Sequence, residues 1–121
     1  MTDEKQLRLR LLYGREIAMG PGKITLLHAI QETGSISAAA RSMNMSYRRA
    51  WMLVATMNRC FREPLVEAAP GGLGGGGAKL TELGLTVLKK YEAMETIAIN
   101  AVDQHLKRFS KLLAEQPPDE T

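Results

Sequence analysis

Cysteine is nearly absent from this sequence, which limits the folds and sites that it can encode. Among 121 residues there is one cysteine, Cys60, so an intramolecular disulfide and a cysteine-rich zinc site are both excluded. A chain with no disulfide framework fits a reducing compartment, and we expect a cytoplasmic protein.

Long hydrophobic runs are also missing. No stretch approaches the roughly 18 apolar residues that span a membrane, and the polar residues 1–10 lack the pattern of a signal peptide. We therefore expect no membrane partner. Hydrophobic residues still make up 45% of the chain, which is enough for one packed domain of this length.

Acidic residues are missing from Thr33 to Arg62, although the whole chain has a net charge of only +3. This segment carries five arginines, while the rest of the chain has 11 Lys and Arg against 13 Asp and Glu. A basic segment on a nearly neutral body is typical of a protein that binds the phosphate backbone of nucleic acid. A solvated, arginine-rich helix face has the same composition, so charge alone leaves both interpretations open.

Hydrophobic periodicity predicts a short strand and a first helix. Alternating leucines indicate a half-buried strand over residues 6–12. Apolar residues at helical spacing predict a helix over residues 23–32, with Pro21 near its start and Gly34 just past its end.

Two further helices are predicted to form a helix-turn-helix over residues 35–62. Ser35 is the expected N-cap of a short helix that ends at Met43, and Asn44 suits the left-handed backbone of a tight turn. Ser46 is the expected N-cap of the next helix, which runs to about Arg62 before Glu63-Pro64 stops it.

A helical wheel divides the third helix into two faces. The predicted core face contains Ala50, Trp51, Val54, Met57 and Phe61, and the predicted outer face contains Arg48, Arg49, Met52, Thr56 and Arg59. Arginine binds guanine in bidentate fashion, so we expect the outer face to enter the major groove of DNA. Tyr47 in the first turn either packs against the protein or contacts DNA.

A glycine-rich loop at residues 71–77 lies between two short predicted strands, 65–69 and 78–80. A phosphate-binding loop would need a Lys-Ser or Lys-Thr pair after its glycines, but Lys79 is followed by Leu80. We therefore predict a β-hairpin wing over residues 65–80, whose backbone N–H groups and Lys79 approach DNA phosphates. A flexible hairpin without DNA contact is the alternative.

The last predicted helix begins after Thr81 and runs to about Leu113. Its roughly 32 residues would extend about 48 Å, further than a domain of this size. Apolar residues and a histidine recur at heptad-like spacing on one side, which predicts a homodimer on an inverted-repeat operator. The expected interface consists of Tyr91, Met94, Ala98, Ala101, Val102, His105, Phe109 and Leu112. A helix that folds back on its own domain is the alternative.

Catalytic and metal-binding patterns have little support. His28 and His105 lie on separate predicted helices, and no Cys, Asp or Glu joins them at metal-ligand spacing. Cys60 has no obvious base beside it. We expect neither an enzyme nor a metal site.

Several motifs together resemble the N-terminal DNA-binding domain of the molybdate-responsive regulator family, ModE. They are GSIS at 34–37 with Ala40, SYRRAW at 46–51, Met57-Asn58, Leu65-Val66-Glu67, and the glycine run at 71–77 before LTELG at 80–84. The similarity covers about residues 5–110. It implies a winged helix, with the recognition helix at 46–62, the wing at 68–80 and a dimerising C-terminal helix.

Members of that family continue into a molybdate-binding domain, whereas this sequence ends at Thr121, so we expect the single-domain form without a cofactor. We predict a mainly α fold with a small β wing (α+β): a winged helix-turn-helix over 1–80, a dimerisation helix over 81–114 and a flexible tail over 115–121. The predicted DNA contacts are Ser35, Ser37, Ser46, Tyr47, Arg48, Arg49, Met52, Thr56, Arg59, Gly74, Gly75, Gly76 and Lys79.

The predicted function is that of a sequence-specific regulator of transcription that binds double-stranded DNA. A protein-interaction module on the same scaffold and an oxyanion-binding protein for molybdate or a similar ion are the alternatives.

Overall fold

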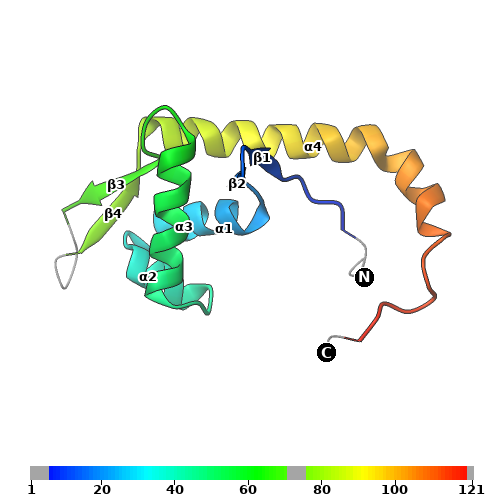
Figure 1. Cartoon of the computed structure of the whole chain (residues 1–121), viewed down its shortest axis with the longest axis horizontal. Helices are drawn as coiled ribbons and strands as arrows, with labels where there is room; N and C mark the ends of the chain where they lie inside the picture. The colour runs from blue at the N-terminus through cyan, green and yellow to red at the C-terminus, as the bar shows by residue number, and fades with distance from the viewer. Residues whose placement is uncertain (1–5, 71–75, 120–121) are drawn as a thin grey trace.

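The computed structural model describes residues 6–70 and 76–119, and it contains four helices and two β-hairpins (Figure 1). In chain order the elements are β1 Leu11–Tyr13, β2 Glu16–Met19, α1 Pro21–Thr33, α2 Ile36–Ser42, α3 Tyr47–Cys60, β3 Val66–Ala69, β4 Gly77–Leu80 and α4 Glu82–Ser110. Both hairpins are antiparallel pairs, β1 with β2 and β3 with β4. The predicted fold class, mainly α with a small β wing, is confirmed.

Local signals in the sequence place the helix ends well. Pro21 occupies the first turn of α1, and Gly34 ends it with a φ of 77°. The Ser35 hydroxyl accepts a hydrogen bond from the Ala38 N–H at the start of α2, and Asn44 has the left-handed φ of 59° in the following turn. These interactions satisfy backbone groups that helix ends leave free. The predicted first helix of the helix-turn-helix and the turn after it are therefore confirmed.

The core lies between α1, α2, α3, the first half of α4 and the two hairpins. Leu26, Leu27 and Ile30 on α1 have no exposed surface, and neither has Met57 on α3 or Leu65 before β3. Small residues on α2, including the fully buried Ala39, let α1 and α3 approach closely. The same packing leaves the opposite sides of α2 and α3 at the molecular surface.

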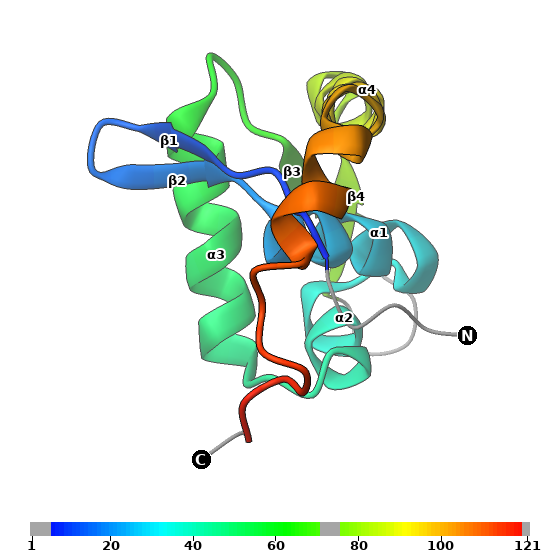
Figure 2. The ribbon, with the colours of Figure 1, turned by 90° about the vertical axis from the view of Figure 1, so that its right-hand side faces the viewer.

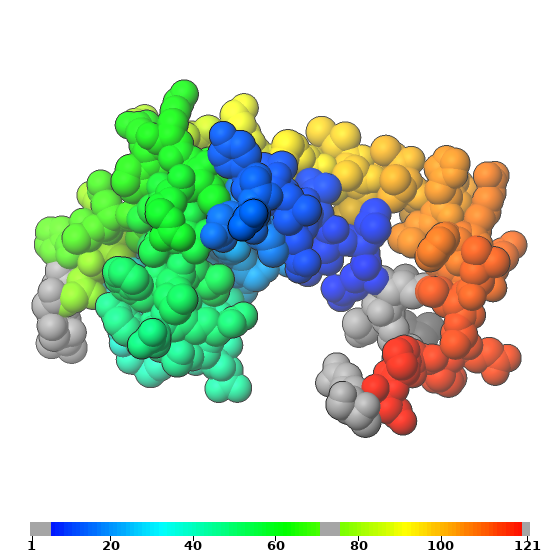
Figure 3. Space-filling view, viewed as in Figure 1, coloured from blue at the N-terminus to red at the C-terminus, as the bar shows by residue number. Residues whose placement is uncertain are grey.

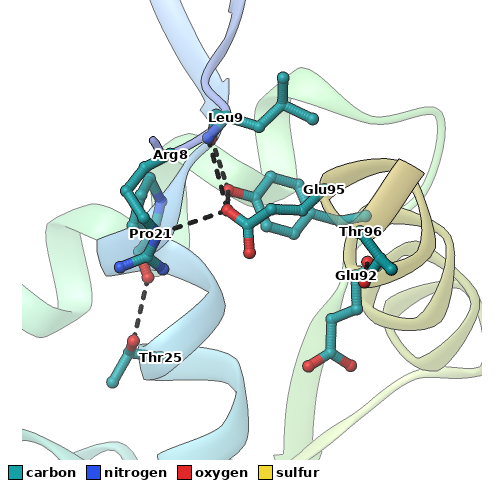
Figure 4. A network of polar contacts seen from close by, with 8 residues as sticks. Arg8, Leu9, Pro21, Thr25, Glu92, Glu95 and Thr96 are labelled. Atoms are coloured by element: carbon teal, nitrogen blue, oxygen red, sulfur yellow. Dashed lines mark hydrogen bonds and ion pairs between the residues drawn. The ribbon is translucent and has the colours of Figure 1, made fainter. Parts of the chain in front are cut away.

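The N-terminal strand predicted over residues 6–12 is wrong in extent. The first strand begins only at Leu11, and a tight turn at Gly14 returns the chain as β2, which lies within the predicted linker. Residues 6–10 run beside α4, where the Leu9 N–H donates a hydrogen bond to Glu95 (Figure 4). Of the alternating leucines, Leu9 packs against the core, Leu7 is exposed, and only Leu11 pairs in a sheet.

Helix α4 has 29 residues and is about 44 Å long. It crosses the rest of the domain and extends past it (Figure 1). Seen almost along α4, the β1–β2 hairpin projects beside α3 (Figure 2). The helix ends at Ser110, three residues before the predicted end, and only Gly84, Leu88 and Tyr91 on it are buried.

Tyr91 belongs to the core of its own chain, which corrects its prediction as a dimer-interface residue. Its side chain is 3% exposed, and its hydroxyl donates to the Leu9 carbonyl. Burial raises the pKa of Tyr91, and the neighbouring Glu95 raises it further. The heptad pattern alone does not distinguish a helix face that docks on its own domain from one that meets a partner.

Two acidic residues connect α4 to the rest of the domain. The Glu95 carboxylate accepts hydrogen bonds from the Leu9 N–H and from Arg8, both at 3.4 Å (Figure 4). One turn earlier, Glu92 lies 3.0 Å from the His28 imidazole of α1. These contacts fix the direction of α4 relative to the helix-turn-helix.

Within residues 6–70 and 76–119, no helix is both long and apolar enough to cross a bilayer.

Candidate nucleic-acid interface

The candidate interface is built on α3. The Ser46 hydroxyl caps this helix by accepting a hydrogen bond from the Arg49 N–H at 3.1 Å. Ala50, Val54 and Met57 are buried on its inner side. The cap holds the first turn, which carries Tyr47, Arg48 and Arg49, in a fixed helical geometry.

Trp51 is not in the core, contrary to prediction. Trp51 is 53% exposed. Phe61, which was also assigned to the core, is half-buried and packs against the core. The core is filled by Ala50 and Val54 instead, and on a helix Trp51 points about 100° away from Ala50. On the helical wheel Trp51 lies at the edge of the predicted apolar face, and the packing of the domain leaves this edge exposed to solvent.

The predicted outer face is exposed as expected. Ser46, Tyr47, Arg48, Arg49, Met52 and Arg59 are all exposed, and Thr56 is half-buried. In the space-filling view α3 lies at the surface next to the β1–β2 hairpin (Figure 3). A shallow depression of about 340 Å³ on this face is lined by Ser46, Arg48, Arg49, Met52, Leu53 and Thr56. Leu53 is a member of this surface that the sequence did not predict.

The arginines of α3 are available to a ligand. Across the described parts of the chain, Arg48, Arg49 and Arg59 form no ion pair with a carboxylate, and Arg59 only approaches the Thr56 hydroxyl at 3.5 Å. Arg62 lies beyond the end of α3, which stops at Cys60, and pairs with Glu63 at 3.8 Å. Within the described part of the chain, the positive charge of these α3 arginines is therefore not neutralised by a carboxylate.

The two serines predicted on α2 have structural partners. Ser35 caps α2, and the Ser37 hydroxyl accepts a hydrogen bond from Arg41 at 2.9 Å. Both side chains are half-buried, whereas Arg41 is exposed. The pair of Ser37 and Arg41 extends the basic surface of α3 onto α2.

The wing strands β3 and β4 pair in the predicted position. Lys79 on β4 lies 3.8 Å from Glu67 on β3, and both side chains are largely exposed. Gly76 is exposed just before β4, whereas the predicted contacts Gly74 and Gly75 lie outside the described residues.

Asn58 joins α3 to the wing, a role that was not predicted from the sequence. Its side-chain oxygen accepts hydrogen bonds from the N–H groups of Leu65 and Val66, at 2.8 and 3.2 Å, and its amide donates to the Val66 carbonyl. An Asn near the end of a helix before a short connection was the only signal. Because of these bonds, α3 and β3 keep a fixed relative position.

The predicted interface on α4 is partly accessible. Apart from Tyr91, its members are exposed or half-buried: Met94, Ala98, Ala101, Val102, His105, Phe109 and Leu112. Leu112 lies beyond the helix end, and Ile97, 67% exposed, adjoins the same face although it was not predicted. No group of three His, Cys, Asp or Glu that would suit a metal ion occurs among the described residues.

Comparison with known proteins identifies the family. Residues 22–85, more than half of the chain, match the model of bacterial regulatory helix-turn-helix proteins of the lysR family. The chain belongs to this family. The matched region contains the helix-turn-helix, the wing and the start of α4. The prediction of a helix-turn-helix is confirmed.

Similar proteins confirm the resemblance to ModE. The chain is 45% identical over 101 residues to the molybdenum-pterin-binding protein MopB of Rhodobacter capsulatus, covering 84% of this chain and 36% of MopB. It is 40% identical to the transcriptional regulator ModE of Yersinia pestis, covering 83% of this chain and 38% of that protein. With the DNA-binding transcriptional dual regulator ModE of Escherichia coli the identity is 36%, with the same coverage. The chain thus spans less than two fifths of the length of these relatives.

Solved structures agree with the lysR-type fold. The full-length LTTR LysG from Corynebacterium glutamicum, with bound effector Arg, matches with a TM-score of 0.52 and 20% identity, covering 77% of this chain and 30% of LysG. A second LysR family transcriptional regulator also matches with a TM-score of 0.52, at 17% identity, covering 78% of this chain and 30% of its own. At these identities the likeness shows the fold alone.

Proposed function

We propose that this chain regulates transcription by binding duplex DNA in a sequence-specific manner, and that it acts as a binding protein and not as an enzyme. The observation that carries the proposal is the outer face of α3, where Arg48, Arg49 and Arg59 are exposed and pair with no carboxylate of residues 6–70 and 76–119. Bidentate arginine contacts read guanine in the major groove, which accommodates one α-helix. The acid-free sequence from Thr33 to Arg62 adds attraction to the phosphates.

The wing supports the same proposal. Asn58 holds β3 against α3, so that the β3–β4 hairpin flanks the recognition helix (Figure 1). In this position Lys79 would approach the DNA backbone next to the groove that α3 enters. The contacts to phosphate position the protein, and those from α3 specify the sequence.

We further propose that two copies associate through α4. From Glu92 to its end, α4 has no buried residue in the chain, and Met94, Ile97 and Phe109 are 48%, 67% and 60% exposed. A second copy of the same helix would cover these side chains and would place two recognition helices about a two-fold axis. Such a dimer reads an inverted repeat.

The names of the relatives ModE and MopB suggest target genes in molybdenum metabolism. Among the described residues, the arginines on α3 are the groups that an anion would bind. We propose that they contact the phosphates and bases of DNA. Calorimetry with molybdate, tungstate and sulfate tests this assignment, because an oxyanion-binding protein would release heat with one of them. We expect no heat at millimolar ligand.

The decisive experiment selects bound fragments from genomic DNA and then measures affinity for the selected operator and for random duplex. Arg48→Ala/Arg49→Ala should lose at least about tenfold in affinity for the operator and much less for random DNA. Lys89→Ala/Lys90→Ala removes the same charge from exposed positions of α4 and should retain specificity. Equal affinity for operator and random DNA at physiological salt would favour a protein-interaction module instead.

A further inference from the structure

The exposed indole of Trp51 calls for an explanation. Trp51 is the one tryptophan of the chain, and 53% of its surface is open on α3. Tyr47 lies one turn before it on the same side of the helix and is 56% exposed. Large aromatic side chains bury more apolar area than any others, so two of them exposed on one helix side indicate a surface that a partner covers.

Trp51 lies on the side of α3 that faces the wing. Residues seven apart in an α-helix lie within about 20° of each other, so Trp51 shares its side of α3 with Asn58. Asn58 is hydrogen-bonded to the backbone of β3. The aromatic pair of Tyr47 and Trp51 therefore lies between the outermost arginines and the wing, and Arg48 is adjacent to both on the helix surface.

Charge decides whether a second copy of the chain or duplex DNA covers the pair. In a two-fold contact between two copies, each patch faces the same patch, and the arginines of both acid-free segments would be brought together. Like charges without counter-charges disfavour that contact. Duplex DNA brings phosphates to the same arginines, so its charge complements this surface.

We propose that Trp51, supported by Tyr47, packs against the C5 methyl groups of thymines at the wing-side edge of the major groove and so makes α3 select thymine there. The methyl group is the apolar feature that the major groove presents, and it distinguishes thymine from cytosine. The indole N–H remains free to donate to a phosphate. The inference rests on the proposed function, and it names a base class that the arginines do not read.

The test replaces thymines of the selected operator, one at a time, by deoxyuridine, which lacks only the methyl group. Wild-type protein should lose about three- to fourfold in affinity for each methyl group that Trp51 covers. Trp51→Ala should bind the thymine operator more weakly by at least that factor and should no longer distinguish thymine from uracil at those positions. Tyr13→Ala, which removes an exposed aromatic outside α3, should behave like wild type.

Fluorescence gives a second readout because Trp51 is the only indole. Operator binding should shift its emission to shorter wavelength and protect it from acrylamide. The inference is overturned if operator binding changes neither the emission nor the quenching of Trp51. It is also overturned if the ratio of affinities for the thymine and uracil operators is the same for wild type and Trp51→Ala. A third contrary result is that Trp51→Ala changes the oligomeric state in solution but leaves DNA affinity unchanged. In all three cases operator selection by wild type would stand, whereas absence of any operator preference would refute the proposed function itself.

Discussion

The Tyr91 hydroxyl lies 3.1 Å from the Glu95 carboxylate, one turn further along α4. The same hydroxyl donates to the Leu9 carbonyl, and the same carboxylate accepts from the Leu9 N–H, so the N-terminal segment is held to α4 from two directions. If α4 carries the partner subunit, this cluster sets the angle at which each recognition helix meets DNA. Contacts remote from the DNA surface would then influence operator geometry.

Glu95→Gln is expected to destabilise the fold in a pH-dependent manner. Burial acts to raise the pKa of Glu95, but hydrogen bonds from Leu9, Tyr91 and Arg8 lower it below the ordinary 4.5. A lowered carboxyl pKa contributes stability above its unfolded value, and that stability is lost as the pH falls through the folded pKa. Urea unfolding should therefore show a loss of about 1–2 kcal/mol at pH 7 and a smaller one at pH 3.5.

The matched control for this substitution is Glu115→Gln, in the exposed segment after α4, which should leave stability unchanged at both pH values. An equal loss for Glu95→Gln at pH 7 and pH 3.5 would show that its charge is not what the hydrogen bonds stabilise.

The sequence predicted features that depend on neighbours along the chain. Ser35 and Ser46 cap helices as expected, because a hydroxyl needs only the next turn as its partner. The prediction failed for two aromatic residues. Trp51, expected in the core, is exposed, and Tyr91, expected at the dimer interface, is buried. Both lie on apolar helix faces, and only the packing of α3 on α1 and of α4 on residues 6–10 decides which face is covered. Asn58 was missed for the same reason, since its partners are backbone groups of another element.

Gly84→Ala is expected to destabilise the protein by more than about 2 kcal/mol. A Cβ at this position would lie 2.2 Å from the Leu65 carbonyl oxygen, which the backbone cannot move easily because the Thr81 N–H donates to the same oxygen. Thermal unfolding should show a melting temperature lowered by several degrees.

Gly22→Ala is the control for this change, because a Cβ there meets nothing within 4 Å and the residue lies in the first turn of α1. It should leave stability unchanged or raise it by up to about 1 kcal/mol. If Gly84→Ala were as stable as Gly22→Ala, α4 would not approach Leu65 as closely as the structure shows.

Asn58→Ala is expected to weaken both the fold and DNA binding. It leaves the N–H groups of Leu65 and Val66 without their side-chain acceptor, which costs about 1–3 kcal/mol in urea unfolding. The wing would also lose its fixed position beside α3, so affinity should fall on operator and random duplex alike. Asn100→Ala, at an exposed site on α4, should change neither quantity.

Met94→Asp is expected to separate the proposed dimer. Met94 is 48% exposed on the side of α4 that we assign to the second copy, so a carboxylate there would be buried against its symmetry mate without a counter-charge. Light scattering should give about 13.3 kDa for the variant and twice that mass for wild type at micromolar concentration. Thr96→Asp, on the opposite side of α4 and also exposed, introduces the same charge and should remain dimeric.

The DNA affinity of Met94→Asp distinguishes loss of dimerisation from loss of folding. A folded monomer retains α3, so it should bind a single half-site as well as the wild type does at matched subunit concentration. On the full inverted repeat it should lose the gain that comes from linking two recognition helices. If the variant were monomeric but bound the full repeat with wild-type affinity, reading of the operator by a dimer would be refuted, and each wing and α3 would act alone.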